Sequence, residues 1–168
     1  MTTPDLAQLV SAVGDAIIVS DAQGLITLWN PGAERMFGFT QAEAMGQSLD
    51  IIIPERQRQR HWEGYEKTMA TGITRYGSDV LRVPAINKAG EPLSISFTVG
   101  MLFKSDGKVD SIAAVMRDET RKFHQDKALR VRLKELEAQI ASQSPKPFPA
   151  TPTDDASPVG ERCPVKHD

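Results

Sequence analysis

The chain has 168 residues, of which 40% are apolar and 25% are charged, and its net charge is −2. This composition is that of a single globular domain, and a slightly acidic chain is a poor candidate for general nucleic-acid binding, which needs a clearly basic surface. The sequence has no run of about 18 apolar residues and no signal peptide, and Cys163 is its one cysteine. We therefore expect a cytoplasmic protein without membrane spans, disulfides or a cysteine-built zinc site.

The first part of the chain predicts a short helix followed by a β-hairpin. Residues 1–14 place apolar side chains at helical spacing behind a Thr3 cap, with Pro4 in the first helical position. Residues 16–20 and 25–29 are apolar segments on either side of a four-residue turn, which is the pattern of two antiparallel strands. We treat the first of these elements as a helix that flanks the domain.

Two short helices and one long helix are expected next. Asn30 and Pro31 are the residue types favoured at the cap and the first position of a helix. Thr40 and Glu43 have the spacing of a capping box, which predicts a further single turn. The longest predicted helix covers residues 54–72.

Three strands complete the predicted domain, which spans residues 15–119. The strand-like segments are 79–86, 92–103 and 109–117, and glycine-containing turns separate them. Two strands, a group of helices and then a three-stranded meander indicate an α+β fold. We expect an antiparallel five-stranded sheet with the short helices on one side.

The end of the chain predicts a helix and a tail. Residues 120–141 are helical in pattern, and their apolar positions have the spacing four, three, four that is typical of a coiled-coil seam. These positions are Leu129, Leu133, Leu136 and Ile140. The seam favours a homodimer, and the proline-rich residues 142–168 are expected to be disordered.

Four segments resemble the landmarks of PAS domains, in the same order along the chain. They are residues 21–38, 46–49, 87–92 and 117–120, and the resemblance covers about residues 10–120. It implies the PAS fold, with N- and C-terminal helices flanking the sheet, in a module used for sensing and dimerisation. The fold does not select a ligand, because related PAS domains bind haem, flavin, small acids or nothing.

His61 is the one side chain of the domain that packing and turns leave unexplained. It lies on the long helix beside the apolar positions Trp62 and Tyr65, and Gly64 and Thr68 leave the adjoining face nearly bare. A glycine inside a helix costs about 1 kcal/mol relative to alanine, so a packing or ligand reason for it is expected. A lone helix histidine is more often a core or rim residue, and a close approach of helix and sheet would also explain the glycine.

The resemblance favours iron at this position. Haem-binding oxygen-sensor PAS domains carry their proximal histidine on this helix, at fixed intervals from an Ile-Pro or Met-Pro pair upstream and an Asp-Gly-type turn downstream. His61 is similarly spaced from Ile53-Pro54 and from Gly90, with no gap needed. The cofactor that the resemblance implies is haem b, with His61 as the iron ligand.

The resemblance also assigns the surroundings of the haem. The residues expected to contact it are Trp62, Tyr65, Lys67, Arg75, Leu81, Phe97 and Val99. Lys67 and Arg75 fall where relatives carry the partners of the haem propionates. Leu81 stands where oxygen sensors usually place an arginine that donates to dioxygen, and strand alternation points Arg82 to the other face.

The apolar residues expected on the distal side of the haem change which gas the site should favour. Without a donor, bound dioxygen loses a hydrogen bond of about 1–3 kcal/mol, while carbon monoxide and nitric oxide lose less. Tyr76 is a possible substitute donor. The sequence therefore predicts a sensor of a diatomic gas or of redox state rather than of oxygen in particular.

The sequence also has to be compared with functions other than haem-based gas sensing. The main alternative is a PAS interaction module that binds a different small molecule or none. Flavin photochemistry is not expected, because residues 47–51 lack the cysteine of light-sensing relatives. No catalytic arrangement predicts an enzyme, which leaves only a weak haem-based oxidation. The expected partners are a diatomic gas, a second copy of the chain and a separate signalling protein such as a kinase or regulator.

Overall fold

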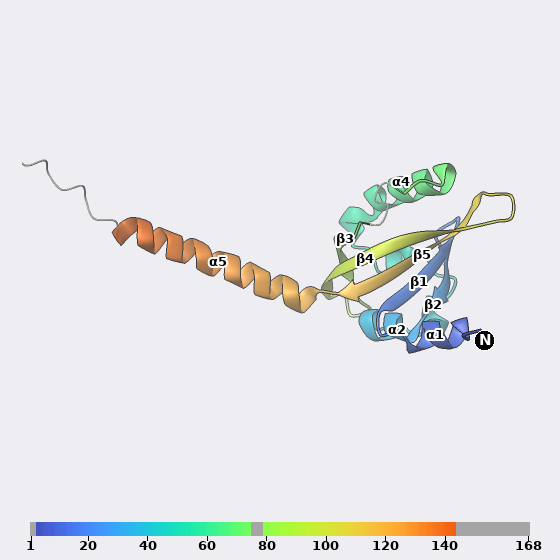
Figure 1. Ribbon diagram of the computed structural model, residues 1–168, viewed down its shortest axis with the longest axis horizontal. Helices are drawn as coiled ribbons and strands as arrows, with labels where there is room; N and C mark the ends of the chain where they lie inside the picture. The colour runs from blue at the N-terminus through green and yellow to red at the C-terminus, as the bar shows by residue number, and fades with distance from the viewer. Residues whose placement is uncertain (1–2, 75–78, 144–168) are drawn as a thin grey trace, which may run out of the picture. The chain divides into compact units, whose positions relative to one another are not determined.

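The computed structural model describes residues 3–74 and 79–143 of the chain (Figure 1). The predictions for Arg75, Tyr76 and residues 144–168, which include Cys163, lie outside these described residues. The last helix ends at Gln143, two residues beyond the predicted end at 141. Contacts divide the chain into two compact units, and the boundary falls inside the last helix, between Leu129 and Arg130.

Within the described residues, the structure has five strands and six helical segments. One antiparallel sheet contains all five strands in the order β2-β1-β5-β4-β3. The elements are α1 (Leu6–Ala12), β1 (Ala16–Asp21), β2 (Ile26–Trp29), α2 (Pro31–Phe37), α3 (Gln41–Ala44), η1 (Leu49–Ile51), α4 (Glu55–Thr71), β3 (Leu81–Ile86), β4 (Pro92–Phe103), β5 (Val109–Asp118) and α5 (Thr120–Gln143). The predicted α+β fold is confirmed.

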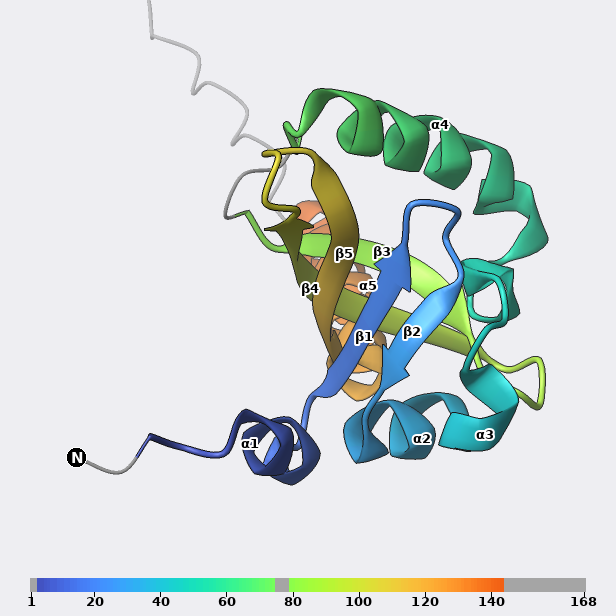
Figure 2. The same ribbon diagram turned by 90° about the vertical axis from the view of Figure 1, so that its right-hand side faces the viewer.

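One buried cluster joins the sheet to the helices on one of its faces. Alternate residues of β1 are buried, as expected for a strand with one face on a core. Residues of α2, α3, η1 and α4 belong to the same buried cluster. Figure 2 shows the ribbons of α2, α3 and α4 beside the sheet. The largest fully buried side chains are Trp29, Phe37, Ile18 and Ile26.

Asn30 connects three elements at the start of α2. Its side-chain oxygen accepts from the amides of Ala33 and Ile17, at 2.9 and 2.8 Å. Its amide group donates to the carbonyls of Val10 and Asp15, at 3.1 and 3.0 Å. A buried amide with all of these partners caps α2 and fixes the chain between α1 and β1.

The start of α1 differs from the prediction. Its cap is Asp5 rather than Thr3, and Pro4 therefore precedes the helix. The Asp5 carboxylate accepts from the amides of Ala7 and Gln8, at 2.9 and 3.2 Å. A carboxylate at this place satisfies two free amides and also favours the positive end of the helix dipole.

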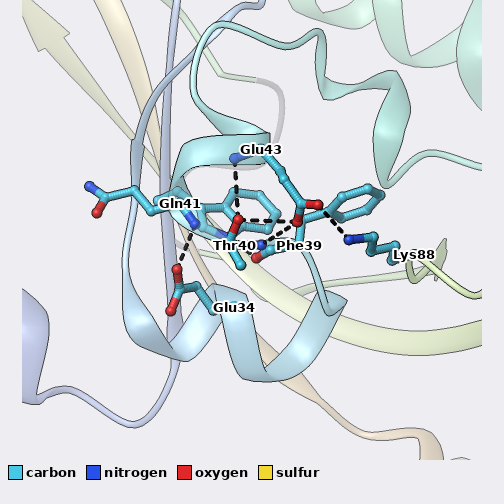
Figure 3. A network of polar contacts seen from close by, with 7 residues as sticks. Glu34, Phe39, Thr40, Gln41, Glu43 and Lys88 are labelled. Carbon is cyan, nitrogen blue, oxygen red and sulfur yellow. Dashed lines mark hydrogen bonds and ion pairs between the residues drawn. The ribbon is translucent and has the colours of Figure 1, made fainter.

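A polar network joins α3 to the turn between β3 and β4 (Figure 3). Thr40 and Glu43 form the predicted capping box. The Glu43 carboxylate also lies 2.6 Å from the Lys88 ammonium group, in the β3–β4 turn. The hydrogen bond from Lys88, supported by the amide and hydroxyl of Thr40, lowers the pKa of Glu43 to about 2.

The start of α5 is attached to the meander. The Glu119 amide donates to the Ser94 carbonyl at 2.8 Å, and the Ser94 amide donates to the Thr120 hydroxyl at 2.9 Å. The Glu119 carboxylate lies 3.2 Å from the guanidinium group of Arg82 in β3. None of the helices within residues 3–74 and 79–143 is long and apolar enough to cross a bilayer.

Candidate functional site

The α4 helix is tied to the preceding segment near its N-terminal end. It begins directly after Pro54 and ends at Gly72, which has a left-handed conformation. The Arg58 guanidinium group donates to the carbonyls of Ile53 and Asp50, at 3.2 and 3.1 Å. The first turns of α4 are therefore held against η1.

Trp62 lies between η1 and the β1–β2 hairpin. Its indole Nε1 donates to the Asp50 carboxylate at 2.9 Å. Its ring covers Gly24, where an added Cβ atom would overlap with the indole carbons. Gly24 also has a φ of +76°, which favours glycine on conformational grounds.

Tyr65 attaches α4 to the end of β1. It is 7% exposed, and its hydroxyl donates to the Asp21 carbonyl at 2.5 Å. The phenol has a single proton, so the Ser20 hydroxyl, 2.9 Å away, donates to the Tyr65 oxygen. Burial raises the pKa of the phenol, which keeps Tyr65 neutral.

His61 lies beside these two aromatic rings. Its ring centroid is 4.9 Å from that of Trp62, nearly perpendicular to it, and 5.8 Å from that of Tyr65. Its Nδ1 atom is buried and has no hydrogen-bond partner among the described residues. Burial lowers the pKa of His61, against the opposing charge of Asp50. The neutral imidazole is the form that ligates a metal.

The helix surface next to His61 is open. A Cβ atom added at Gly64 would meet nothing within 4 Å, so a close approach of helix and sheet does not explain this glycine. The Thr68 hydroxyl donates back to the Gly64 carbonyl at 2.9 Å and so lies along its own helix. Both residues leave room beside the imidazole.

Strands β3 and β4 carry an apolar surface that other side chains cover only in part. Leu81 of β3 pairs with Phe97 of β4, and Val99 follows two residues later on the same face. All three are only half-buried, whereas Met116 and Ala114, their neighbours in β5, are buried. This end of the sheet can accept further apolar contact.

The remaining candidates are charged. Lys67 is exposed on α4, and Arg82 is exposed on β3, where it pairs with Glu119. Arg75 lies outside the described residues. No group of three or more histidine, cysteine or acidic side chains is placed for a metal ion in the part of the chain that the structure describes. A metal at His61 would therefore need a cofactor to supply its other ligands.

Sequence reasoning did not identify three residues that shape this site. Asp50, Gly24 and Ser20 each contact an aromatic residue of α4. They belong to a short 3-10 helix, a turn and a strand, and no local pattern distinguishes them from other residues in such elements. Only the three-dimensional arrangement brings them to α4.

The fold and the sequence agree with one family. Residues 5–118 match the family model of the PAS fold. The chain belongs to the PAS family. It is therefore a PAS sensor domain with a role in signal transduction, as the sequence motifs predicted.

Curated relatives match parts of the domain. Sensor protein FixL of Bradyrhizobium diazoefficiens is 43% identical over 56 residues, which are 33% of this chain and 11% of that protein. An uncharacterised protein of Azorhizobium caulinodans is 33% identical over 86 residues, 51% of this chain and 12% of that protein. The chain thus spans about a tenth of the length of these two relatives.

Solved structures share the fold. A PAS domain from Colwellia psychrerythraea superimposes with a TM-score of 0.61 at 22% identity, covering 69% of this chain and 95% of the other. An RNA-binding light-oxygen-voltage receptor does so with a TM-score of 0.62 at 17% identity, covering 80% and 41%. At these identities the likeness concerns the fold of the PAS domain.

Proposed function

We propose that this PAS domain binds haem b through His61 and senses a diatomic gas or a redox change. The observation that carries the proposal is the buried Nδ1 atom of His61, which has no partner among the described residues. Buried polar atoms are nearly always hydrogen-bonded, so an unsatisfied one calls for a functional reason. The similarity to a sensor protein over 56 residues supports the proposal.

Other residues have defined roles in it. The half-buried surface of Leu81, Phe97 and Val99 would form the distal wall. Lys67 and Arg75 would pair with the propionates through charge-assisted hydrogen bonds. Bound haem supplies an iron centre that takes a gas ligand or changes oxidation state. The open surface at Gly64 and Thr68 supports placing a flat, largely apolar group beside α4.

Trp62 and Tyr65 have two roles in this proposal: they line the site, and they hold α4 in place. Trp62 and Tyr65 use their polar atoms for contacts with Asp50, Ser20 and Asp21. Their rings remain beside His61. In this proposal they contact one side of the site and fix the imidazole at a constant distance from the hairpin.

The apolar wall decides which gas is favoured. Leu81 has no donor for a bound ligand, and the Arg82 guanidinium group is engaged with Glu119. Carbon monoxide and nitric oxide therefore suit the pocket better than dioxygen. The same wall lacks the acid–base group that peroxide cleavage normally uses, so oxidative turnover would be weak.

The signal would pass to a partner. We propose a homodimer formed with the exposed leucines of α5, and a separate signalling protein such as a kinase or regulator as the recipient. The attachment of α5 to β3 and β4 supports this route, because β3 also carries Leu81. The β3 strand thus contacts both the proposed pocket and the start of α5.

The test is the visible spectrum of haem-loaded protein. We expect a Soret band that shifts when carbon monoxide is added to the reduced protein, and that is lost or altered in His61→Ala. His124→Ala is the matched control, because His124 is exposed on α5. A Soret band of equal strength and position in all three proteins would exclude His61 as the ligand.

A second function remains in competition. An interaction module without haem would use the same sheet face as an ordinary core and would bind another small molecule or none. The hydrogen bonds of Trp62 to η1 and of Tyr65 to the hairpin favour this alternative, since they stabilise α4 without a cofactor. Protein that stays colourless after expression with a haem precursor would support it.

A further inference from the structure

Asp50 of η1 binds Trp62, the residue that follows His61 on α4. We propose that Asp50 is a positioning residue for the iron ligand, which holds His61 through Trp62 and places a negative charge beside the imidazole. The inference rests on the proposed haem function and deepens it. Neither the sequence motifs nor the relatives assign a role to Asp50.

Two side chains of α4 end on this one residue. Trp62 Nε1 donates to Asp50 Oδ1 at 2.9 Å, and the Arg58 guanidinium group donates to the Asp50 carbonyl at 3.1 Å. Arg58 Nε also lies 3.7 Å from the same carboxylate oxygen. Residues four apart lie on one face of a helix, so Asp50 binds a single face of α4 one turn in length.

Trp62 cannot move freely on its other side. Its ring lies against Gly24, where even a methyl group would overlap with it. The hydrogen bond to Asp50 and the contact with Gly24 therefore fix the indole between two segments of the chain. The His61 ring, 4.9 Å away and nearly perpendicular, takes its position from this fixed ring.

Asp50 also acts by its charge. Its side chain is 35% exposed, so its field is only partly screened by water. The carboxylate binds the Trp62 indole at 2.9 Å, and the centroid of that ring is 4.9 Å from the centroid of the His61 ring. An anion near an iron ligand stabilises the ferric more than the ferrous state. Residues that orient a ligand from outside the coordination sphere typically change metal affinity by about 10–100-fold.

Three variants separate position from charge. Asp50→Asn keeps an oxygen that accepts from the indole and removes the charge. Trp62→Phe removes the donor and keeps the charge, and Asp50→Leu removes both the acceptor and the charge. Glu55→Gln is the control for charge alone, because Glu55 is an exposed acid in the first turn of the same helix.

The readouts are haem dissociation into an excess of acceptor apoprotein and the reduction potential of the bound haem. We expect dissociation to be about tenfold faster or more in Asp50→Leu and Trp62→Phe, and unchanged in Asp50→Asn. We expect a higher potential in Asp50→Asn and Asp50→Leu, and an unchanged potential in Trp62→Phe and Glu55→Gln. Wild-type rates and potentials in both Asp50 variants would overturn the inference.

A failure of the haem proposal is distinguishable from a failure of this one. If the wild-type spectrum does not depend on His61, the proposed function is wrong. The Asp50 link is then tested in apoprotein by the NMR signals of the Trp62 indole proton and the His61 ring. Movement of both signals in Asp50→Leu, with neither moved in Asp50→Asn, supports positioning, and unchanged His61 signals in Asp50→Leu overturn it. If Asp50→Leu does not fold, Asp50→Asn and Trp62→Phe carry the test.

Discussion

Trp62 lies directly against Gly24, so a side chain of α4 occupies the space that a side chain in the β1–β2 turn would need. The contact joins two residues 38 positions apart in the chain. It makes the turn glycine necessary for two independent reasons, its positive φ and the ring beside it. These two reasons can be measured separately.

Gly24→Ala is expected to destabilise the domain more than Gly90→Ala. Both glycines have nearly the same φ, +76° and +78°, but nothing lies within 4 Å of an added Cβ atom at Gly90. The left-handed conformation costs alanine about 1–2 kcal/mol at either position. Overlap with Trp62 should add about 1–3 kcal/mol at Gly24 alone. Urea unfolding of both variants measures the difference, and equal losses would show that the indole moves aside.

Tyr65→Phe should lower the free energy of unfolding by about 1–3 kcal/mol, because two hydrogen bonds of the phenol are lost. The Ser20 hydroxyl loses its acceptor, and the Asp21 carbonyl keeps only the Gly24 amide as a donor. Ser20→Ala should cost less, since Tyr65 keeps its bond to Asp21. A double-mutant cycle with denaturant unfolding gives the coupling between the two hydroxyl groups. Additive losses would mean that their hydrogen bond contributes nothing.

Gly64→Ala should stabilise the apoprotein by up to about 1 kcal/mol, because alanine is the better helix former and the added methyl group meets nothing. Ala70→Gly, at an exposed position of the same helix, is the reverse control and should cost a similar amount. Thermal or urea unfolding measures both. In haem-loaded protein, the bulkier Gly64→Leu should weaken haem retention if the cofactor lies on this face.

The Glu43–Lys88 pair predicts a pH dependence of stability. The pKa of Glu43 in the folded protein, about 2, is below its usual value of 4.5. Its contribution to stability is therefore present above about pH 4.5 and is lost as the pH falls toward 2. We expect Glu43→Gln to flatten the fall of stability in this window, measured by urea midpoints at successive pH values.

Lys88→Met gives an independent check of the same pair. It removes the hydrogen bond that contributes most to the low pKa, so the Glu43 carboxyl should titrate closer to its usual value. Carbon-detected NMR titration follows this carboxyl directly. A titration that is the same with and without Lys88 would assign the effect to Thr40 instead.

The exposed leucines of α5 predict self-association. Leu129, Leu133 and Leu136 are 68%, 57% and 40% exposed, which is unusual for a seam of apolar residues unless a partner covers it. Leu133→Glu should therefore shift a dimer toward monomer in sedimentation experiments. Lys134→Glu, at the neighbouring position off the seam, is the control and should leave the association state unchanged.

Sequence patterns predicted those parts of the fold that depend on neighbouring residues. The Asn30 cap, the Thr40–Glu43 capping box and the strand alternation of the meander are all decided within a few residues. The cap of α1 was wrong, because Thr3 and Asp5 are both good cap residues and spacing alone did not separate them. In the structure the Asp5 carboxylate accepts from two amides of the first turn.

The candidate site was less predictable for a physical reason. The spacing of the sequence identified His61, but it did not identify the residues that Trp62 and Tyr65 contact beside it. Trp62 meets a residue 12 positions away, and Tyr65 meets one 45 positions away. Such contacts depend on how η1 and β1 are oriented once the core has formed. The sequence therefore predicts His61 as the iron ligand, but no sequence pattern identifies Asp50.

Both borders of the described sheet carry features that disfavour strand addition. At one border, residues 46–49 run beside the short β2 strand and bond to it through Ile26 and Gly24. At the other, β3 carries Pro84 and Arg82, and proline and charge on an edge strand disfavour pairing with another chain. These features favour association between copies through side-chain surfaces rather than through added strands, and single substitutions on such surfaces can change it.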